Sequence, residues 1–134
     1  FLGTQSMKPT TYRGPSAILV SHNDHGILMD SAEGSYGQIC DHFKTKEDID
    51  EIIMKTQFIF ITHIHGDHQL GILKMMSERD LLHSGVDEMN KLYVITPTPM
   101  MEWMKEFVQD SLKYPEMVVL VPSKSLNPEK AYYY

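Results

Sequence analysis

The sequence contains a single cysteine, Cys40, in 134 residues, which excludes an internal disulfide framework. It also has no surplus of basic residues, because 12 Lys and Arg stand against 18 Asp and Glu, for a formal net charge of -6. A nucleic-acid-binding protein usually carries a basic patch, so contact with a polyanion here would need a local basic site, metal ions or another part of a longer protein. No apolar run approaches the roughly 20 residues that cross a bilayer, so we expect no membrane association.

The chain lacks a starting methionine and has no histidine after His83. Its first residues, FLGT, show no charged-then-apolar leader, so no secretory signal is visible. Its last residues, AYYY, carry no helix-ending signal. Because both ends look like the middle of a protein, we expect a piece of a longer chain, with the size of one ordinary domain. The single cysteine indicates a reducing and thus intracellular compartment.

The pattern that is present alternates strands and helices. Apolar runs predict strands at 16–20, 27–30, 57–62, 92–96 and 117–121. Helical spacing predicts helices at 36–43, 46–55, 70–82 and from Pro99 onward. This order predicts a layered α/β protein.

Three local features refine this prediction. The stretch 22–26 joins the first two strands as a hairpin turn, and Thr98 is the expected N-cap of the last helix. The run at 57–62 is continuously apolar, which is typical of a strand buried on both sides. The polar stretch 84–90 is the best candidate for a mobile loop.

The strand predicted at 57–62 runs directly into four ligand-type side chains, namely His63, His65, Asp67 and His68. Alternate side chains of an extended backbone point the same way, so the first two would be aimed together. Gly66 then allows a sharp turn that brings the other two back toward the same centre. Imidazole and carboxylate groups suit zinc, and four of them in six positions suit two adjacent ions better than one.

Simpler interpretations of the polar residues stay open. Asp67 could cap the helix that follows it. A second group, His22, Asp24 and His25, falls in the predicted hairpin turn, where polar residues are ordinary. His42 and His83 lie on predicted helices without a ligand partner in sequence, so we interpret them as surface or structural residues.

The motif HIHGDH resembles the H-x-H-x-D-H signature of the metallo-β-lactamase superfamily. The stretches FLGTQSMKPTTYRGPSAILV, ILMDSAEGSYGQI and FIFITHIHGDHQLGI together resemble tRNase Z, the endonuclease that trims the 3′ end of precursor tRNA. They are most similar to the carboxyl-terminal catalytic half of its long eukaryotic form, from Phe1 to about Val121. The resemblance implies the amino-terminal half of an αββα sandwich, so that residues 1–134 form a partial metallo-β-lactamase domain.

The resemblance implies a role for each residue of the motif. His63 and His65 would bind one zinc ion, and Asp67 and His68 would bind the other. Asp67 would also orient or deprotonate the attacking water, and would thus be the catalytic residue. Asp30 matches an aspartate that supports the metal loop from the end of a neighbouring strand.

Further residues would line the site on the substrate side. Glu33 and Ser35 belong to a turn that the family places beside the metals. Lys8 and Arg13 belong to an opening loop that the family places near the tRNA acceptor end, although an ordinary surface arginine is an equal alternative for Arg13. Lys8, Arg13 and Ser35 are thus the candidate substrate-binding residues.

The chain departs from the family in two ways. Gln5 and Ala32 stand where the family usually has glycine, so the turn at Ala32 is expected to be adjusted. The family's remaining ligands, two histidines and a bridging aspartate, lie downstream of the segment matched here. The resemblance therefore implies partial zinc occupancy and no nuclease activity from the isolated chain.

Two other functions remain open from the sequence. One is a different hydrolase of the superfamily that cleaves a thioester or a small ester, and the other is a non-catalytic half-domain that serves as a scaffold. Because half a sandwich exposes apolar surface, we expect association with the missing remainder or with another copy. A long eukaryotic form would place the protein in the nucleus or the mitochondrion, and otherwise it would be cytoplasmic.

Overall fold

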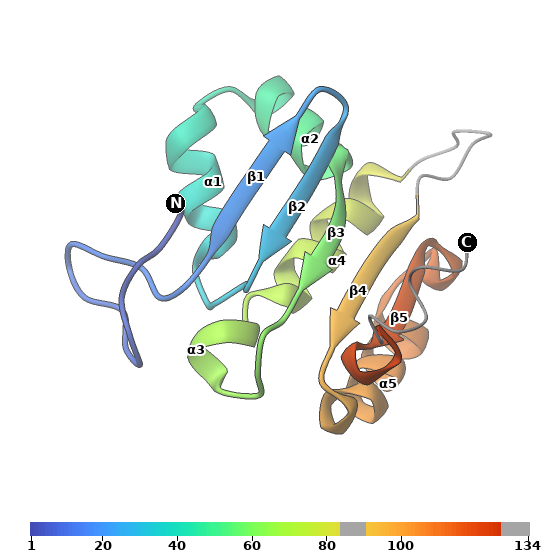
Figure 1. Cartoon of the computed structure of the whole chain (residues 1–134). Helices are drawn as coiled ribbons and strands as arrows, with labels where there is room; N and C mark the ends of the chain where they lie inside the picture. The colour runs from blue at the N-terminus through green and yellow to red at the C-terminus, as the bar shows by residue number, and fades with distance from the viewer. Residues whose placement is uncertain (84–90, 127–134) are drawn as a thin grey trace.

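The computed structural model describes residues 1–83 and 91–126, so the loop predicted at 84–90 lies outside the described residues. The described residues form a five-stranded sheet with the strand order β1-β2-β3-β4-β5 (Figure 1). The strands are β1 (Ile18–His22), β2 (His25–Met29), β3 (Thr56–Phe60), β4 (Leu92–Thr96) and β5 (Val118–Pro122). β1 and β2 are antiparallel, whereas β2 to β5 are parallel to one another.

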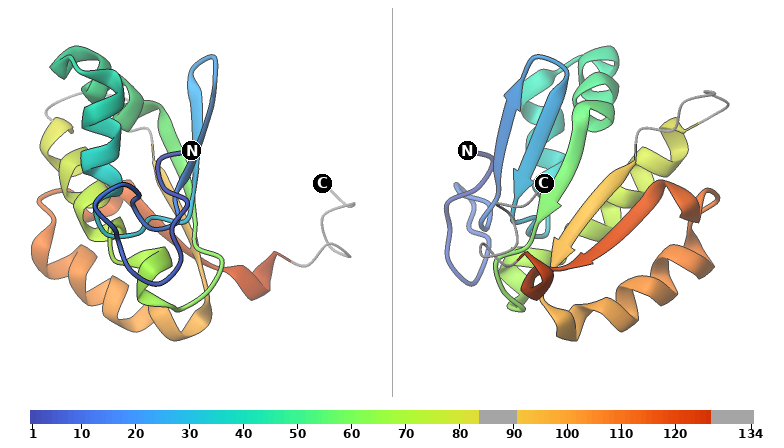
Figure 2. Two further views of the ribbon diagram at one scale, coloured as in Figure 1. Left: turned by 90° about the vertical axis from the view of Figure 1, so that its left-hand side faces the viewer. Right: turned by 45° about the vertical axis from the view of Figure 1, so that its right-hand side comes forward.

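The helices are α1 (Ser35–Phe43), α2 (Lys46–Lys55), α3 (Gly66–Gln69), α4 (Ile72–Leu82) and α5 (Met101–Ser111). Three 3-10 turns are η1 (Thr98–Met100), η2 (Pro115–Met117) and η3 (Ser123–Ser125). The longer helices α1, α2, α4 and α5 all lie on one side of the sheet (Figure 2). In the described part of the chain, no helix is long and apolar enough to cross a membrane.

The core lies between the sheet and this helical layer. Leu28, Ile59 and Val94 are register partners on neighbouring strands, and each is at most 1% exposed. The preceding residue on each strand points to the opposite side of the sheet, as the period of two requires. Those residues, Ile27, Phe58 and Tyr93, are 36–42% exposed. The predicted α/β half-sandwich is therefore confirmed as one sheet with one helical layer.

The same arrangement corrects the expectation that 57–62 is buried on both sides. β3 has a buried face toward the helices and a second face on which Phe58 stacks against Tyr93 in the open, with ring centroids 5.4 Å apart. A continuous apolar run is compatible with a strand that is buried on both faces. It is equally compatible with a strand such as β3, whose second face is not covered by the described residues.

The hairpin is present, but its turn is shorter than predicted. β1 continues through His22 and β2 begins at His25, so only Asn23 and Asp24 form the turn. Asn23 has φ 52°, and asparagine tolerates this left-handed conformation better than most residues. His22 and His25 are thus paired strand residues and not turn residues.

Two helix predictions need correction as well. The helix predicted at 70–82 is present as α4 but begins two residues later, at Ile72, and the separate short helix α3 precedes the predicted range. Thr98 is not an N-cap, because it begins the 3-10 turn η1 and its side chain caps no helix end. Pro99 lies within this turn, which leads into α5.

Candidate metal centre

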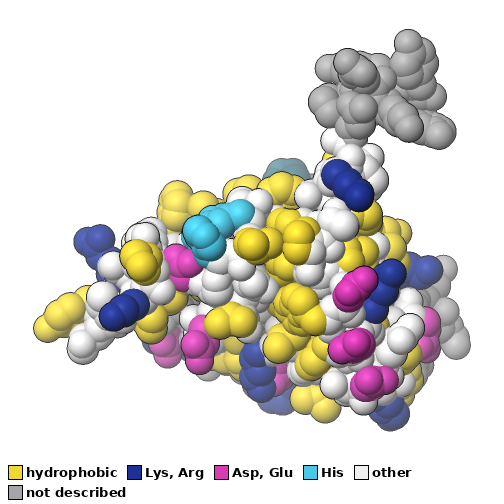
Figure 3. All heavy atoms as spheres, turned by 90° about the horizontal axis from the view of Figure 1, so that it is seen from below, with side chains coloured by type: hydrophobic (Ala, Val, Ile, Leu, Met, Phe, Trp, Pro, Cys, Tyr) yellow, Lys and Arg dark blue, Asp and Glu magenta, His cyan; other side chains and the backbone are white. Residues whose placement is uncertain are grey.

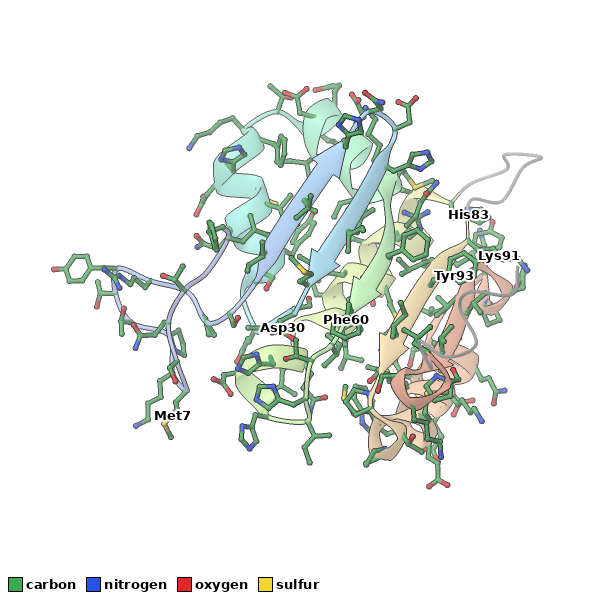
Figure 4. The ribbon with its side chains drawn as sticks, viewed as in Figure 1. Met7, Asp30, Phe60, His83, Lys91 and Tyr93 are labelled. Carbon is green, nitrogen blue, oxygen red and sulfur yellow. The ribbon has the colours of Figure 1, made fainter. Side chains whose placement is uncertain are left out.

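The candidate site lies at the carboxyl ends of β2 and β3. Seen from below in Figure 3, histidine side chains gather on the surface at this end of the molecule. Asp30 follows β2 and lies beside the last residue of β3, Phe60 (Figure 4), whose carbonyl accepts a hydrogen bond from the Asp30 N–H at 2.8 Å. The two strand ends are thereby joined where the chain enters the histidine-rich bend.

Asp30 connects three parts of the bend. It is only 6% exposed and adopts φ 56°, a conformation that aspartate tolerates. Its Oδ1 accepts hydrogen bonds from the N–H and the hydroxyl of Thr62, both at 2.9 Å. Its Oδ2 accepts from Nδ1 of His68 at 2.7 Å. A carboxylate bound to one imidazole nitrogen fixes the ring and leaves the other nitrogen, Nε2, for a metal ion.

His63 and His65 form the first ligand pair. Nδ1 of His63 lies 2.9 Å from the Thr62 hydroxyl, and its Nε2 lies 3.1 Å from Nδ1 of His65. Two nitrogens that bind one tetrahedral zinc at the usual bond length lie about 3.3 Å apart. The spacing of these two nitrogens therefore fits ligands of a shared ion.

Asp67 and His68 form the second pair. Oδ2 of Asp67 lies 3.6 Å from Nε2 of His68, the nitrogen that Asp30 leaves free. The main-chain N–H of Met7 donates to the same Oδ2 at 2.7 Å and holds the pKa of Asp67 below its ordinary value. Asp67 is therefore a carboxylate at neutral pH, which is the form that binds a cation.

The two pairs are adjacent, since the His63 and His68 rings have centroids 4.0 Å apart. Within residues 1–83 and 91–126, however, no group of three or more His, Cys, Asp and Glu side chains converges on one point. The donor types fit zinc, and each pair supplies two of the four positions that a tetrahedral ion needs.

No family model matches the chain. The mouse protein named zinc phosphodiesterase ELAC protein 2 is 31% identical over 128 residues, which is 94% of this chain and 15% of that protein. The Arabidopsis thaliana protein named tRNase Z TRZ3, mitochondrial, is 33% identical over 107 residues, which is 79% of this chain and 12% of that protein. The crystal structure of a long-form RNase Z from yeast superimposes with a TM-score of 0.76 at 22% identity, over 90% of this chain and 17% of that one.

This chain is a homologue of the tRNase Z proteins. Its fold is that of the metallo-β-lactamase proteins, as the predicted resemblance implied. The chain spans about 15% of the length of the mouse relative, so the match concerns one segment of a much longer protein.

In this tRNase Z homologue, a pocket of about 490 Å³ adjoins the bend and is lined by one member of each ligand pair, His65 and Asp67. Met7, Pro9 and Pro15 from the opening loop line it, together with Glu33 from the turn before α1. The rest of the lining comes from the bend and its neighbours, namely His65, Gly66, Asp67 and Leu70. The structure thus brings the predicted turn residue Glu33 to the same pocket as Asp67.

The three candidate substrate-binding residues differ in where they lie. Lys8 and Arg13 are exposed on the opening loop, and Arg13 lines a smaller pocket, of about 220 Å³, together with Glu33. Ser35 is only 3% exposed, and its hydroxyl donates to the carbonyl of Ala32 at 2.7 Å. The structure therefore corrects the placement of Ser35, which begins α1 and holds the turn instead of facing the pocket.

The turn before α1 also differs from the expectation for Ala32. Gly34 carries the left-handed conformation there, at φ 86°, whereas Ala32 is not among the residues with positive φ. Alanine at position 32 therefore needs no adjustment of the turn, and its side chain is fully buried.

Sequence reasoning missed three residues that shape the site. Thr62 orients both Asp30 and His63, and Met7 holds Asp67. Gly71 donates its N–H to Ser31, and a Cβ at this position would lie 2.0 Å from the Ala32 carbonyl oxygen. The hydroxyl of Thr62, directly before His63, was the one signal visible in the sequence.

Proposed function

We propose that this chain is the amino-terminal part of the catalytic domain of a zinc-dependent endoribonuclease that removes the 3′ trailer of precursor tRNA by phosphodiester hydrolysis. The observation that carries the proposal is the Asp30–His68 hydrogen bond, which frees Nε2 of His68 beside the carboxylate of Asp67. This arrangement occurs in a chain whose relatives are named for tRNA processing and zinc.

In this proposal His63 and His65 hold one zinc ion, and Asp67 and His68 hold the second. Bound zinc would lower the pKa of a coordinated water and neutralise charge on the phosphodiester. Asp67 orients the attacking water or accepts its proton, because its carboxylate is ionised and faces the pocket. Asp30 holds His68 in the orientation that leaves its Nε2 free, and Thr62 holds His63 with its Nε2 toward Nδ1 of His65.

The pocket beside Asp67 is the proposed position of the tRNA 3′ end. Arg13 and Lys8 are exposed cations on the opening loop. Other residues of the same loop, Met7, Pro9 and Pro15, line this pocket. Contacts of such side chains with phosphates fix the register of a nucleic acid without reading its bases. Because the net charge is -6, these local cations and the metal ions would supply the attraction for RNA.

The isolated chain is proposed to bind zinc weakly or partially and to lack nuclease activity, because each ligand pair fills only half of a tetrahedral shell. Its partners would be precursor tRNA and the remainder of the longer protein. Its compartment would be the nucleus or the mitochondrion, and the name of the Arabidopsis relative places that relative in the mitochondrion.

Cleavage of a precursor tRNA by the full-length parent protein tests the proposal. His65→Ala is expected to lower the rate by about 100-fold or more by removing a zinc ligand, and the exposed His42→Ala on α1 is the matched control. Trailer release that is equally fast in both variants would overturn the proposal. It would favour the non-catalytic half-domain, an alternative that gains support from the presence of only two separate ligand pairs.

A thioester substrate tests the remaining alternative, a hydrolase of the same superfamily that cleaves thioesters or small esters. We expect no hydrolysis of a thioester or a small ester above background by the parent protein. A parent that hydrolyses the thioester in a His65-dependent manner while leaving precursor tRNA intact would assign the site to the other hydrolase branch.

A further inference from the structure

Met7 adopts a backbone conformation that is unusual for its residue type. Its φ is 65°, a region that non-glycine residues with long side chains seldom occupy. The N–H of Lys8 donates to the carbonyl of Ser6 at 2.8 Å, so Met7 is the central residue of a three-residue turn. A turn of this hydrogen-bond pattern with positive φ is rare and strained. Strained residues concentrate at functional sites, where the surrounding structure maintains them.

The side chain of Met7 does not explain this conformation, because it is 78% exposed (Figure 4). The base of the opening loop is fixed independently, since the N–H groups of Thr4 and Gln5 both donate to the carbonyl of Gly14. The turn does, however, aim the N–H of Met7 at Oδ2 of Asp67, 60 positions away in sequence. Among the described hydrogen bonds, this is the only one that joins residues 4–14 to any residue beyond 17.

The hydrogen bond reaches the oxygen that matters for the second ligand pair. Oδ2 of Asp67 is also the atom that faces Nε2 of His68, at 3.6 Å. A carboxylate oxygen has more than one acceptor position, so it can accept the Met7 N–H and still bind a cation. The other main-chain donor to this carboxylate is the N–H of Asp67 itself, so the Met7 N–H is the donor that ties the side chain to another segment and limits its rotation.

We propose that Met7 is a positioning residue for Asp67: its main-chain N–H holds Oδ2 toward His68, and the opening loop thereby sets the orientation of the acidic ligand. Because Met7 also lines the pocket, a ligand that contacts the loop would act on Asp67 through this bond. The proposal rests on the proposed function for the identity of the bound ion, whereas the positioning itself depends only on the geometry of the metal-free chain.

The test removes the N–H and keeps the side chain; it also weakens the Ser6 carbonyl as the acceptor of the Lys8 N–H. An ester in place of the amide between Ser6 and Met7, introduced with a synthetic amino-terminal peptide, keeps the side chain and its chirality. Three-bond NMR couplings to Cγ of Asp67 then report its rotamer in the metal-free, full-length chain. We expect a single rotamer in the wild-type chain and an average over several rotamers in the ester. A single, unchanged rotamer in the ester would overturn the proposal.

Met7→Gly is the matched variant, because it keeps the N–H and relieves the strain of a positive φ. It is expected to retain the single rotamer of Asp67, and loss of that rotamer would contradict a role for the N–H. A reciprocal measurement follows hydrogen exchange of the Met7 amide. Asp67→Ala should speed this exchange by about 10-fold or more, whereas Leu70→Ala, a change in the same pocket wall, should leave it unchanged. Equal exchange in both variants would also overturn the proposal.

Zinc affinity provides an additional readout that is independent of activity. We expect the ester to bind zinc about 10-fold more weakly than the wild-type chain, the loss typical for a group that orients a metal ligand. Failure of precursor tRNA cleavage in the parent would overturn the proposed function and leave the rotamer result intact. The two proposals can therefore fail separately.

Discussion

Nδ1 of His68 donates to Oδ2 of Asp30 at 2.7 Å, although 38 positions separate the two residues in sequence. Asp30 directly follows β2, and His68 belongs to the short helix α3 that follows the neighbouring parallel strand β3. Because the two strands are parallel neighbours, their carboxyl ends lie side by side, and the carboxylate of Asp30 reaches the imidazole of His68. Because Asp30 also accepts two hydrogen bonds from Thr62, one buried side chain orients the whole bend.

Removal of this carboxylate should destabilise the protein. We expect Asp30→Ala to lower the free energy of unfolding by about 3 kcal/mol, because it leaves the Thr62 N–H and hydroxyl and the His68 ring without their acceptor. Urea denaturation followed by circular dichroism measures the change. Asp24→Ala, at an 89% exposed side chain in the hairpin turn, is the control and should stay within about 0.5 kcal/mol of wild type. Equal losses in the two variants would contradict the role assigned to Asp30.

Gly71 should tolerate no side chain. A Cβ at this position would lie 2.0 Å from the Ala32 carbonyl oxygen, so Gly71→Ala must separate the start of α4 from the turn at Ala32. We expect a loss of about 2–3 kcal/mol in the free energy of unfolding, with changed NMR shifts at His68. Gly37→Ala on α1 meets nothing within 4 Å and should stabilise the chain by about 0.5–1 kcal/mol. The two substitutions should change the free energy of unfolding in opposite directions. A Gly71→Ala variant as stable as the wild-type chain would refute the close packing of Gly71 against Ala32.

Arg79 should matter for stability and not for metal binding. Its Nη1 lies 2.7–2.9 Å from the carbonyl oxygens of Ile53, Met54 and Thr56, at the junction of α2 and β3. Burial lowers the pKa of Arg79 to about 10, so the guanidinium remains charged at neutral pH. We expect Arg79→Met to lower the free energy of unfolding by about 3 kcal/mol, equally at pH 6 and pH 8.

The control for Arg79 is Lys74→Met, which removes a cation whose side chain is 57% exposed on the same helix. Its effect should be within about 0.5 kcal/mol. If Arg79→Met unfolds at the same urea concentration as Lys74→Met, the buried hydrogen bonds do not stabilise the junction.

The open side of the sheet should drive association. Phe58 and Tyr93 stack there at 36% and 37% exposure, among further apolar strand residues. We expect the wild-type chain to associate in light scattering and to bind a hydrophobic dye, because monomeric proteins seldom expose a contiguous apolar patch of this kind. Phe58→Glu should reduce both signals, whereas Leu81→Glu, at a 72% exposed residue on α4, should not. A wild-type chain that remains monomeric would count against the half-sandwich.

The sequence predicts the order of elements because the periodicity of apolar residues reports burial locally. The limits of α2 and β4 agree with the predicted ranges, since each lies between clear polar boundaries. The hairpin turn was misjudged because His22 and His25 are polar residues on an exposed strand end, and polarity alone does not separate a turn from such a strand.

The site was predictable in part because some of its residues are neighbours in sequence. The ligand-type residues of the bend share one short segment, so their proximity follows from chain geometry. Ser35 was misplaced because its burial depends on how α1 begins, and Met7 was missed because a main-chain N–H acts there, which no side-chain pattern reveals. Gly71 is needed through a contact with Ala32 that only the packed structure contains.

The central claim is that the bend from His63 to His68 binds metal ions through its side chains. Titration of the 134-residue chain with cobalt(II), followed by visible absorption, tests it most directly. We predict weak binding that is alike in the wild-type chain and in His42→Ala, and that is reduced in His63→Ala and in His65→Ala, which keep only the pair Asp67 and His68. A wild-type chain that binds no cobalt, or His63→Ala and His65→Ala chains that bind it as the wild-type chain does, would contradict the account.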